Sequence, residues 1–475
     1  MIKSKAIILT GLAFSLFLFS QCKKDNQDEP QRPLSTKDLA VPANFDFSTT
    51  KKIAVYISIP QGIPWRTVYV MSADEKKTYL KSMPVDSISR SMISFMRVPS
   101  FLEEVLIKYG DGSLCESEIV QVSGSNLDFT FSKKSAGFKG LTDHKDTDGD
   151  QVIDYEDEYP EDPDRAYDIL YPGGNTINQK GTEAFVPWST YVFEDQWPRL
   201  DDFDYNDLVV DYYYTMVISN SLWHGQYIKE INAAFRFRAS GTNYRNGFGI
   251  ELIGIPAANV EDVLWRVDGG QWRNDLHNLL QEGYIDLQPN NVENNQKNAV
   301  IIISDNISEI LPNPGGSTEI NTLKSSSYQT PVTIEFNIKF PWAKRPYYGC
   351  SLPMWSFPWT ETSLCYDKIN PFLIVNGERG KEVHLANYPP TDLMNKGYFG
   401  LEDDASNISG GTFFTSETGI PWAMDINYSF EYPIENRDLI KAYPALIDWT
   451  QDAGQSRRDW YLPENCVPDH VYQVP

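Results

Sequence analysis

The sequence predicts a mainly β protein with few helices, and three observations lead to this fold class. Short runs of alternating apolar and polar residues recur between Gly, Pro and Asn, which is typical of half-buried strands. The 12 Trp, 27 Tyr and 24 Phe supply the apolar surface that packed sheets bury. Only residues 436–452 show a convincing helical spacing of apolar residues. We expect a small N-terminal β-sandwich, an acidic loop region, and a larger β-sandwich or jelly-roll-like C-terminal domain.

The length and charge of the chain limit its organisation and its partners. Its 475 residues suffice for two or three domains. The 41 Lys and Arg residues face 65 Asp and Glu residues, so the net charge is −24. Nucleic-acid binding requires a basic surface, and we therefore expect no nucleic-acid partner.

Residues 1–21 have the pattern of a lipoprotein signal peptide. Two lysines precede an apolar run over residues 6–19, which is too short to span a bilayer comfortably. Ordinary small-residue cleavage fits poorly, whereas Ser20-Gln21-Cys22 fits a bacterial lipoprotein box. We expect Cys22 to carry the lipid and to attach the chain to a membrane. The alternatives are an ordinary signal peptide and an uncleaved anchor.

Residues 22–43 are polar and contain three prolines, so we expect a flexible tether. The charged residues directly after Cys22 resemble the surface-export signals of some Gram-negative lipoproteins. This resemblance implies an outer-membrane lipoprotein that is exposed on the cell surface. A plain solvated linker, with the body on either side of the outer membrane, is the alternative.

Residues 44–132 are expected to form a small Ig-like β-sandwich. Alternating runs predict strands at residues 53–59, 67–70, 105–109 and 127–131. The tripeptide Gly110-Asp111-Gly112 is typical of a hairpin turn. Several short strands at this spacing favour an antiparallel sandwich.

Residues 166–475 are expected to form the larger β-rich domain. Strands are predicted at residues 208–214, 234–238, 248–252, 300–303 and 332–338. The pair Asn246-Gly247 is typical of a turn. The helix expected at residues 436–452 contains Pro444, which disfavours a continuous helix.

The acidic region at residues 133–165 contains the most specific motif of the chain. Within residues 146–157, acids occupy positions 1, 3, 5, 9 and 12 of a calcium-loop pattern, and position 7 supplies a backbone carbonyl. The expected ligands are Asp146, Asp148, Asp150, Val152, Asp154 and Asp157. Carboxylates this close repel one another strongly without a cation. We expect Ca²⁺ here, and a solvated acidic linker is the alternative.

One position departs from the calcium-loop pattern. Gln151 stands at position 6, where an EF-hand loop has Gly for a sharp turn. We expect this departure to strain the loop or to weaken its affinity for the ion. No convincing helix precedes the loop, so we do not expect a helix–loop–helix sensor.

A second acidic cluster lies just before the strand predicted at residues 208–214. A carboxylate-rich turn at a strand entry can hold a hard cation. The candidate ligands are Glu194, Asp195, Asp202, Asp204, Asn206 and Asp207. Their spacing is less diagnostic than that of the first loop, and polar turn residues that cap a strand are the alternative.

Four cysteines remain after Cys22, at positions 115, 350, 365 and 466. An exported chain permits disulfides, and four cysteines allow three pairings. Cys350 and Cys365 lie close in sequence, and we favour this pair. The other cysteines could be buried thiols.

The loop at residues 146–157 and the acidic, Pro-containing segment after it resemble a thrombospondin type 3 repeat. Tyr159 stands where that family often has Cys. In such repeats Ca²⁺ organises an otherwise structureless loop, so binding free energy becomes local folding free energy. The resemblance implies that Ca²⁺ stiffens the joint between the two β units.

The order of several motifs resembles LruC-domain lipoproteins. In chain order these are Cys22 and residues 146–157, 193–195, 204–207, 244–252, 389–392, 403–407, 421–423 and 459–461. The resemblance covers nearly all of residues 133–461. It implies an exported bacterial lipoprotein with an LruC-type domain at residues 166–475, and it gives no substrate.

The sequence favours binding or structure over catalysis. The Gly-x-Ser-x-Gly and His-Glu-x-x-His motifs are absent, and the five His residues are scattered. A glycosidase needs only two positioned carboxylates, so 65 acids leave that activity open. Six tryptophans are candidates for a sugar-stacking surface, with burial in the core as the alternative. They are Trp197, Trp223, Trp355, Trp359, Trp422 and Trp460.

We therefore expect a lipid-anchored, calcium-stabilised envelope protein that serves in adhesion or in binding a glycan, the matrix or a surface protein. One alternative is an accessory protein or enzyme of polysaccharide breakdown. The other is a purely structural envelope lipoprotein, against which an exposed aromatic patch would argue.

Overall fold

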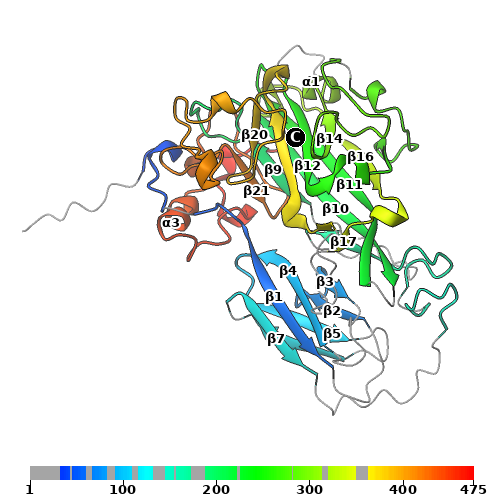
Figure 1. Cartoon of the computed structure of the whole chain (residues 1–475). Coiled ribbons are helices and arrows are strands. Elements are labelled where there is room, and N and C mark those ends of the chain that lie inside the picture. The colour runs from blue at the N-terminus through cyan, green and yellow to red at the C-terminus, as the bar shows by residue number, and fades with distance from the viewer. Residues whose placement is uncertain are drawn as a thin grey trace, which may run out of the picture. The chain divides into compact units, whose positions relative to one another are not determined.

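The computed structural model of the chain is shown in Figure 1. The residues that it describes are 33–42, 45–59, 67–82, 91–109, 116–122, 124–131, 145–154, 157–172, 188–221, 225–280, 282–312, 319–348 and 362–474. The expected signal peptide, Cys22 and the first part of the tether lie outside these residues. Ser35–Pro475 form one compact unit, and Leu39 is buried in a core shared with the C-terminal segment. The flexible-tether prediction is therefore wrong from Ser35 onward.

Two sheets near the N-terminus pack into a small sandwich. Their strand orders are β4-β1-β7 and β3-β2-β5-β6. The strands are β1 (Thr50–Ser58), β2 (Val68–Met71), β3 (Thr78–Ser82), β4 (Ser91–Pro99), β5 (Glu104–Tyr109), β6 (Glu116–Gln121) and β7 (Asn126–Thr130). Side chains from both sheets, such as Val55 and Val70, share one core, as expected from the alternating pattern.

One pairing in this sandwich differs from the expectation of an antiparallel fold. β1 pairs with β7 in parallel, with Val55 opposite Leu127. The chain leaves β6 in the second sheet and returns to the first sheet at β7. Because this connection crosses between the sheets, β7 is not constrained to the antiparallel direction of a hairpin. The antiparallel prediction is therefore wrong for this pair.

The later part of the chain is built on a ten-stranded sheet. The order of its main strands is β13-β16-β11-β10-β9-β21. Four further strands lie off this path: β8 pairs with β10, β15 and β17 pair with β11, and β18 pairs with β17. The strands are β8 (Tyr167–Tyr171), β9 (Ser189–Phe193), β10 (Leu208–Ser221), β11 (Gly225–Gly241), β13 (Asp262–Val267), β15 (Glu319–Ile320), β16 (Val332–Lys339), β17 (Tyr347–Tyr348), β18 (Ser363–Leu364) and β21 (Ala423–Ile426).

A four-stranded sheet covers one face of the ten-stranded sheet. Its order is β14-β12-β19-β20, with β12 (Gly247–Pro256), β14 (Asn298–Ser304), β19 (Ile369–Ile374) and β20 (Glu382–His384). Phe248 of β12 contacts Phe235 and Phe237 of β11, with ring centroids 5.4 and 6.0 Å apart. These side chains belong to the largest core of the protein. The mainly β prediction is confirmed.

The opposite face of the ten-stranded sheet is covered by the C-terminal segment. Val192 of β9 and Val209 of β10 point to this side and share a second core with Leu439, Tyr443 and Trp460. Neighbouring residues on each strand thus serve different cores, because side chains alternate between the faces of a sheet. Figure 1 shows α3 of this segment close to the edge that β9 and β21 form.

The helix expected at residues 436–452 is divided into two. α2 spans Leu439–Ala442 and α3 spans Ala445–Gln451, with Pro444 as the N-cap residue of α3. Pro444 disfavours helical geometry at Tyr443 and cannot donate a backbone hydrogen bond, so one continuous helix was the wrong prediction. The other α-helix of the described residues is α1 (Ile307–Ile310).

No helix in the described part of the chain has the length and apolar character needed to cross a membrane.

Candidate metal centres

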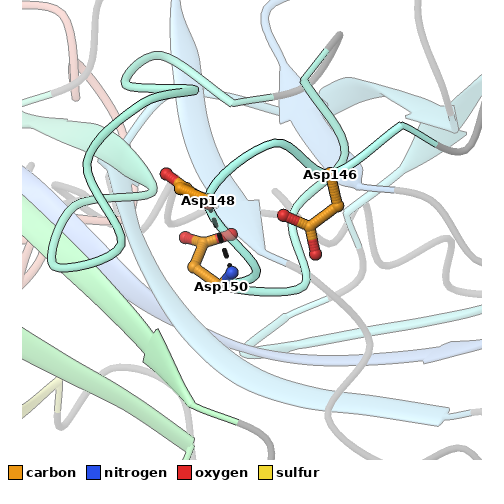
Figure 2. Close-up of side chains that lie close together, drawn as sticks. All are labelled: Asp146, Asp148 and Asp150. Atoms are coloured by element: carbon orange, nitrogen blue, oxygen red, sulfur yellow. Dashed lines mark hydrogen bonds between the residues drawn. The ribbon is translucent and has the colours of Figure 1, made fainter.

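The acidic loop brings three carboxylates together. One oxygen each of Asp146, Asp148 and Asp150 lies within 4.8 Å of the other two. Figure 2 shows Asp148 and Asp150 next to each other and Asp146 across the loop from them, with a hydrogen bond from the Asp150 backbone to Asp148. Asp146 and Asp150 also accept backbone hydrogen bonds inside the loop, from Gln151 N at 2.9 Å and from Val152 N at 2.7 Å. The loop backbone therefore fixes the direction of each carboxylate.

Asp157 lies close enough to this group for the charges of Asp150 and Asp148 to act on it, although its oxygens are not among the three that lie within 4.8 Å of one another. Its Oδ1 accepts a 2.6 Å hydrogen bond from Tyr159 N. The Oδ2 atoms of Asp148, Asp150 and Asp157 are buried and have no hydrogen-bond partner among the described residues. Asp150 and Asp157 are each only 5% exposed. We call Asp146, Asp148, Asp150 and Asp157 the loop cluster.

The electrostatics of the loop cluster disfavour several ionised carboxylates side by side. Burial raises the pKa of Asp150 to about 7, and the charges of Asp148 and Asp146 add to this shift. Burial likewise raises the pKa of Asp157 to about 7, with Asp150 and Asp148 adding to it. A hard cation would satisfy the unpartnered oxygens and remove the repulsion.

The structure places Asp154 and Val152 differently from the four acids. Asp154 accepts hydrogen bonds from Thr147 N at 2.6 Å and Thr147 Oγ1 at 2.7 Å, and it forms an ion pair with Lys145 at 3.0 Å. The Thr147 hydroxyl and Lys145 lower the pKa of Asp154. Asp154 therefore stabilises the start of the loop through Thr147 and Lys145, and it is not in the loop cluster. Val152 buries its side chain in the main core, and the role of its carbonyl stays a prediction.

Gln151 adopts the backbone conformation that the calcium-loop pattern reserves for Gly. Its φ is 77°, in the left-handed region. A residue with a β-carbon loses roughly 1–2 kcal/mol there, whereas Gly does not. The sharp turn therefore forms with Gln in place, at a cost in stability.

We expect Gln151→Gly to raise the thermal stability of the full-length chain, because it removes this backbone strain. The expected gain is about 0.5–1 kcal/mol, since the greater freedom of Gly in the unfolded chain offsets part of the relief. Differential scanning fluorimetry measures it. Gln151→Ala keeps the β-carbon and serves as the control. An equal gain in both variants would show that backbone strain is not the cause.

A second group of acids lies between β9 and β10. Carboxylate oxygens of Glu194, Asp201 and Asp202 approach one another within 4.8 Å, and so do those of Asp202, Asp204 and Glu435. Asp202 belongs to both triads. Burial raises the pKa of Glu194 and of Asp204 well above their usual range, and carboxylates nearby add to both shifts.

Two residues of the predicted second site take other partners. Asp195 N donates a 2.7 Å hydrogen bond to Asp207 Oδ2. Asp195 Oδ2 accepts a 2.7 Å hydrogen bond from Asn246 Nδ2. These bonds join the end of β9 to the start of β10 and to the turn before β12. Asp195 and Asp207 therefore lie beside the two triads and are not part of them.

Sequence reasoning missed Asp201 and Glu435. Asp201 lies next to the predicted Asp202, and the local spacing gave no reason to select it as a ligand. Glu435 comes from the C-terminal segment, where Glu435 Oε2 accepts a 3.0 Å hydrogen bond from Thr322 Oγ1. Burial raises the pKa of Glu435 to about 7, and Asp202 adds to this shift. No local spacing signal connects residues so far apart. We call Glu194, Asp201, Asp202, Asp204, Asn206 and Glu435 the strand-entry cluster.

A carboxyl pair follows the loop cluster. Asp168 N donates a 2.6 Å hydrogen bond to Glu158 Oε2, and Tyr159 OH donates a 2.9 Å hydrogen bond to Asp168 Oδ1. Lys81 of β3 forms a 3.0 Å ion pair with Glu158. Burial raises the pKa of Asp168 to about 7, and the Glu158 charge adds to this shift.

We expect Asp168→Asn to stabilise the chain at pH 8 and to leave it nearly unchanged at pH 4. The folded-state pKa of Asp168 lies above its unfolded value of about 4, so the fold favours the neutral form. The stability supplied by this carboxyl is full below about pH 4 and is lost as the pH rises through 7. The variant should gain roughly 1–3 kcal/mol at pH 8. Urea unfolding at both pH values measures the gain, and an equal gain at both would contradict the assignment.

Three of the tryptophans considered for sugar stacking are core residues. Trp197, Trp422 and Trp460 are fully buried. Trp197 Nε1 donates a 3.0 Å hydrogen bond to Asp404 Oδ1, and Trp422 Nε1 donates one to a backbone carbonyl at 2.9 Å. The stacking interpretation is therefore wrong for these three, because packing of the second sheet and the C-terminal segment encloses them. Trp223, Trp355 and Trp359 lie outside the described residues.

The described cysteines are Cys365 and Cys466. Cys365 is in a disulfide, and its partner lies outside the described residues. Cys466 is a free thiol. Pairing of Cys365 with Cys350 stays a prediction, since Cys350 lies outside the described residues.

Comparisons with known proteins found a family match and a structural match. Residues 226–461 match the model of DUF4842, described as a domain of unknown function. A crystal structure described as that of a "Putative lipoprotein from Bacteroides ovatus" has a TM-score of 0.49 and 15% sequence identity, and the match covers 86% of this chain and 100% of that chain. No curated protein matches the sequence. Residues 226–461 are thus similar to the DUF4842 family.

Proposed function

We propose that the chain is a lipid-anchored envelope protein whose acidic loop holds a structural Ca²⁺ ion. The observation that carries the calcium assignment is the set of three buried Oδ2 atoms, on Asp148, Asp150 and Asp157, that lack partners among the described residues. Buried polar atoms are almost always satisfied in folded proteins. A cation held by Asp148 and Asp150 would satisfy two of these atoms, and Asp157 lies close enough for its charge to be balanced by the same ion.

The donor set favours Ca²⁺ over other ions. All side-chain donors are carboxylate oxygens, and the proposed further ligand is the Val152 carbonyl. Ca²⁺ accepts six to eight such oxygens in flexible geometry, whereas Mg²⁺ requires a near-octahedral shell and retains waters. Soft metals prefer sulfur or imidazole, which the loop cluster does not contain. The resemblance to thrombospondin type 3 repeats supports the same ion.

Ion binding at this loop would stabilise contacts to two different sheets. Asn220 of β10 donates a 3.1 Å hydrogen bond to the Asp150 carbonyl. Glu158, directly after Asp157, pairs with Lys81 of β3. The loop therefore has anchors on the ten-stranded sheet and on the small sandwich. Its ordering by Ca²⁺ would hold both anchors in place.

The location and biological role rest on the sequence. The lipoprotein box at Cys22 and the polar tether support membrane attachment through an N-terminal lipid. The charged residues after Cys22, which resemble the surface-export signals of some Gram-negative lipoproteins, support the outer membrane. A non-enzymatic role in adhesion, or in binding a glycan or surface protein, fits a calcium-stabilised β protein on a tether.

Thermal unfolding tests the calcium assignment. The full-length chain in detergent is melted in Ca²⁺, in Mg²⁺ and in chelator. We expect the melting temperature to rise in Ca²⁺ well beyond its value in Mg²⁺ or chelator, because the ion binds only the folded loop. Equal melting temperatures in all three conditions would overturn the assignment.

Membrane fractionation tests the anchor. Cys22→Ser is expected to release the processed chain from the membrane fraction or to block its processing, since lipid attachment needs the thiol. Cys466→Ser is the matched control and is expected to stay in the membrane fraction. Unchanged size and fractionation of the Cys22 variant would contradict the lipid anchor.

A further inference from the structure

The strand-entry cluster contains two buried oxygens without partners. Glu194 Oε1 accepts a 2.5 Å hydrogen bond from Tyr205 N, whereas its Oε2 has no partner among the described residues. Asn206 Nδ2 donates a 3.2 Å hydrogen bond to the Pro433 carbonyl, and this contact fixes the orientation of the amide. Asn206 Oδ1 also has no partner in the described part of the chain. Glu194 is 1% exposed and Asn206 is 0% exposed.

Both residues lie beside carboxylates of the cluster. Glu194 lies in a triad with Asp201 and Asp202. A Cβ built on Gly241 would lie 1.9 Å from Asn206 Oδ1 and 2.9 Å from Glu435 Oε2, so these two oxygens converge beside Gly241. Ion pairs among the described residues involve other acids, such as Asp211 with Arg238.

We infer that the strand-entry cluster is a second binding site for a hard divalent cation of the Ca²⁺ class. Asp202 is the ligand that both triads share. Ca²⁺ takes oxygen ligands at 2.3–2.6 Å, so two ligands of one ion lie at most about 5 Å apart. Within each triad, one oxygen of every residue lies within 4.8 Å of the others, which meets this condition. The unpartnered Glu194 and Asn206 oxygens supply further ligands. This inference does not depend on Ca²⁺ binding at the loop cluster.

The ion would join two segments that are far apart in sequence. Glu194, Asp202 and Asn206 belong to the connection between β9 and β10, and Glu435 belongs to the C-terminal segment. Asn436 N already donates a 2.8 Å hydrogen bond to Asp204 Oδ2, and Leu439 N donates one to the Phe203 carbonyl at 2.9 Å. The cation therefore reinforces the attachment of α2 to the ten-stranded sheet.

Ion counting in a loop-disabled background tests this inference. Asp148→Ala with Asp150→Ala removes loop-cluster ligands and leaves the strand-entry cluster unchanged. Native mass spectrometry of the full-length chain in detergent with Ca²⁺ is expected to show at least one bound ion in this background. Adding Glu194→Gln with Asp204→Asn is expected to remove it. Asp403→Asn, at an acid that accepts a hydrogen bond from Leu200 N, is the control and should retain the ion.

A milder variant keeps the test decisive if the quadruple variant does not fold. Glu435→Gln in the same background changes a half-buried side chain on the C-terminal segment. We expect its Ca²⁺ affinity to fall at least tenfold, while its melting temperature in chelator stays within a few degrees of the background. The inference is overturned if the folded background binds no Ca²⁺ at millimolar concentration, or if Glu435→Gln leaves the affinity unchanged. Equal ion counts in the wild type and the background would instead overturn the loop-cluster assignment.

Discussion

Asp148→Ala combined with Asp150→Ala is expected to abolish most of the stabilisation that Ca²⁺ gives to the loop region. An ion present at 1,000 times its dissociation constant stabilises the folded state by about 4 kcal/mol. The double variant removes two of the three unpartnered Oδ2 atoms of the loop cluster. It also removes the repulsion that destabilises the ion-free loop. Its melting temperature in chelator should therefore equal or exceed that of the wild type.

Limited proteolysis at residues 145–172 reports on this loop separately from the rest of the protein. In the wild type, Ca²⁺ is expected to slow cleavage of this segment, and in the double variant it should not. Glu118→Ala with Asp128→Ala removes the same charge from exposed positions of the small sandwich and serves as the control. Calcium protection of the double variant equal to that of the wild type would contradict the loop-cluster assignment.

Gly241→Ala is expected to destabilise the chain by about 1–3 kcal/mol and to weaken cation binding at the strand-entry cluster. The added Cβ would lie 1.9 Å from Asn206 Oδ1, which is far below van der Waals contact. Asn206 would have to leave its position and lose its hydrogen bond to the Pro433 carbonyl. Gly241 N also donates a 2.9 Å hydrogen bond to the Asn206 carbonyl, so the two residues cannot separate freely.

Chemical unfolding in Ca²⁺ and in chelator measures this effect. Gly380→Ala is the matched control, because its nearest neighbour would be 3.6 Å from the new Cβ, an ordinary contact. If cation binding contributes, the loss of stability in Gly241→Ala should be larger in Ca²⁺ than in chelator. A variant as stable as Gly380→Ala in both conditions would contradict the close approach that the structure shows.

Many of the strands could be predicted because successive side chains of a strand point to opposite faces, so the apolar pattern repeats every two residues. The run at residues 53–59 places Ile53, Val55 and Ile57 on one face, and all three are fully buried. Sheet partners depend on distant parts of the chain and gave no comparable signal. The parallel pairing of β1 with β7 is one example. The division of the C-terminal helix at Pro444 was foreshadowed by the proline itself, although residues 436–452 were predicted as one element.

The two candidate metal centres differ in how far the sequence could define them. The loop cluster lies within twelve consecutive positions, so spacing alone brought Asp146, Asp148 and Asp150 together. The spacing could not show that Asp154 pairs with Lys145, because that choice depends on local side-chain partners. The strand-entry cluster needs Glu435, which only the tertiary fold brings to Asp202. Spacing between neighbouring residues carries no information about such a contact.

Counting the Ca²⁺ ions bound to the wild-type full-length chain by native mass spectrometry tests the central claim most directly. The claim is that buried carboxylates of the loop cluster and of the strand-entry cluster hold hard cations. We expect at least two Ca²⁺ ions per folded chain, with fewer ions in the Asp148→Ala, Asp150→Ala variant. A folded wild-type chain that binds no Ca²⁺ at millimolar concentration would contradict the claim at both sites.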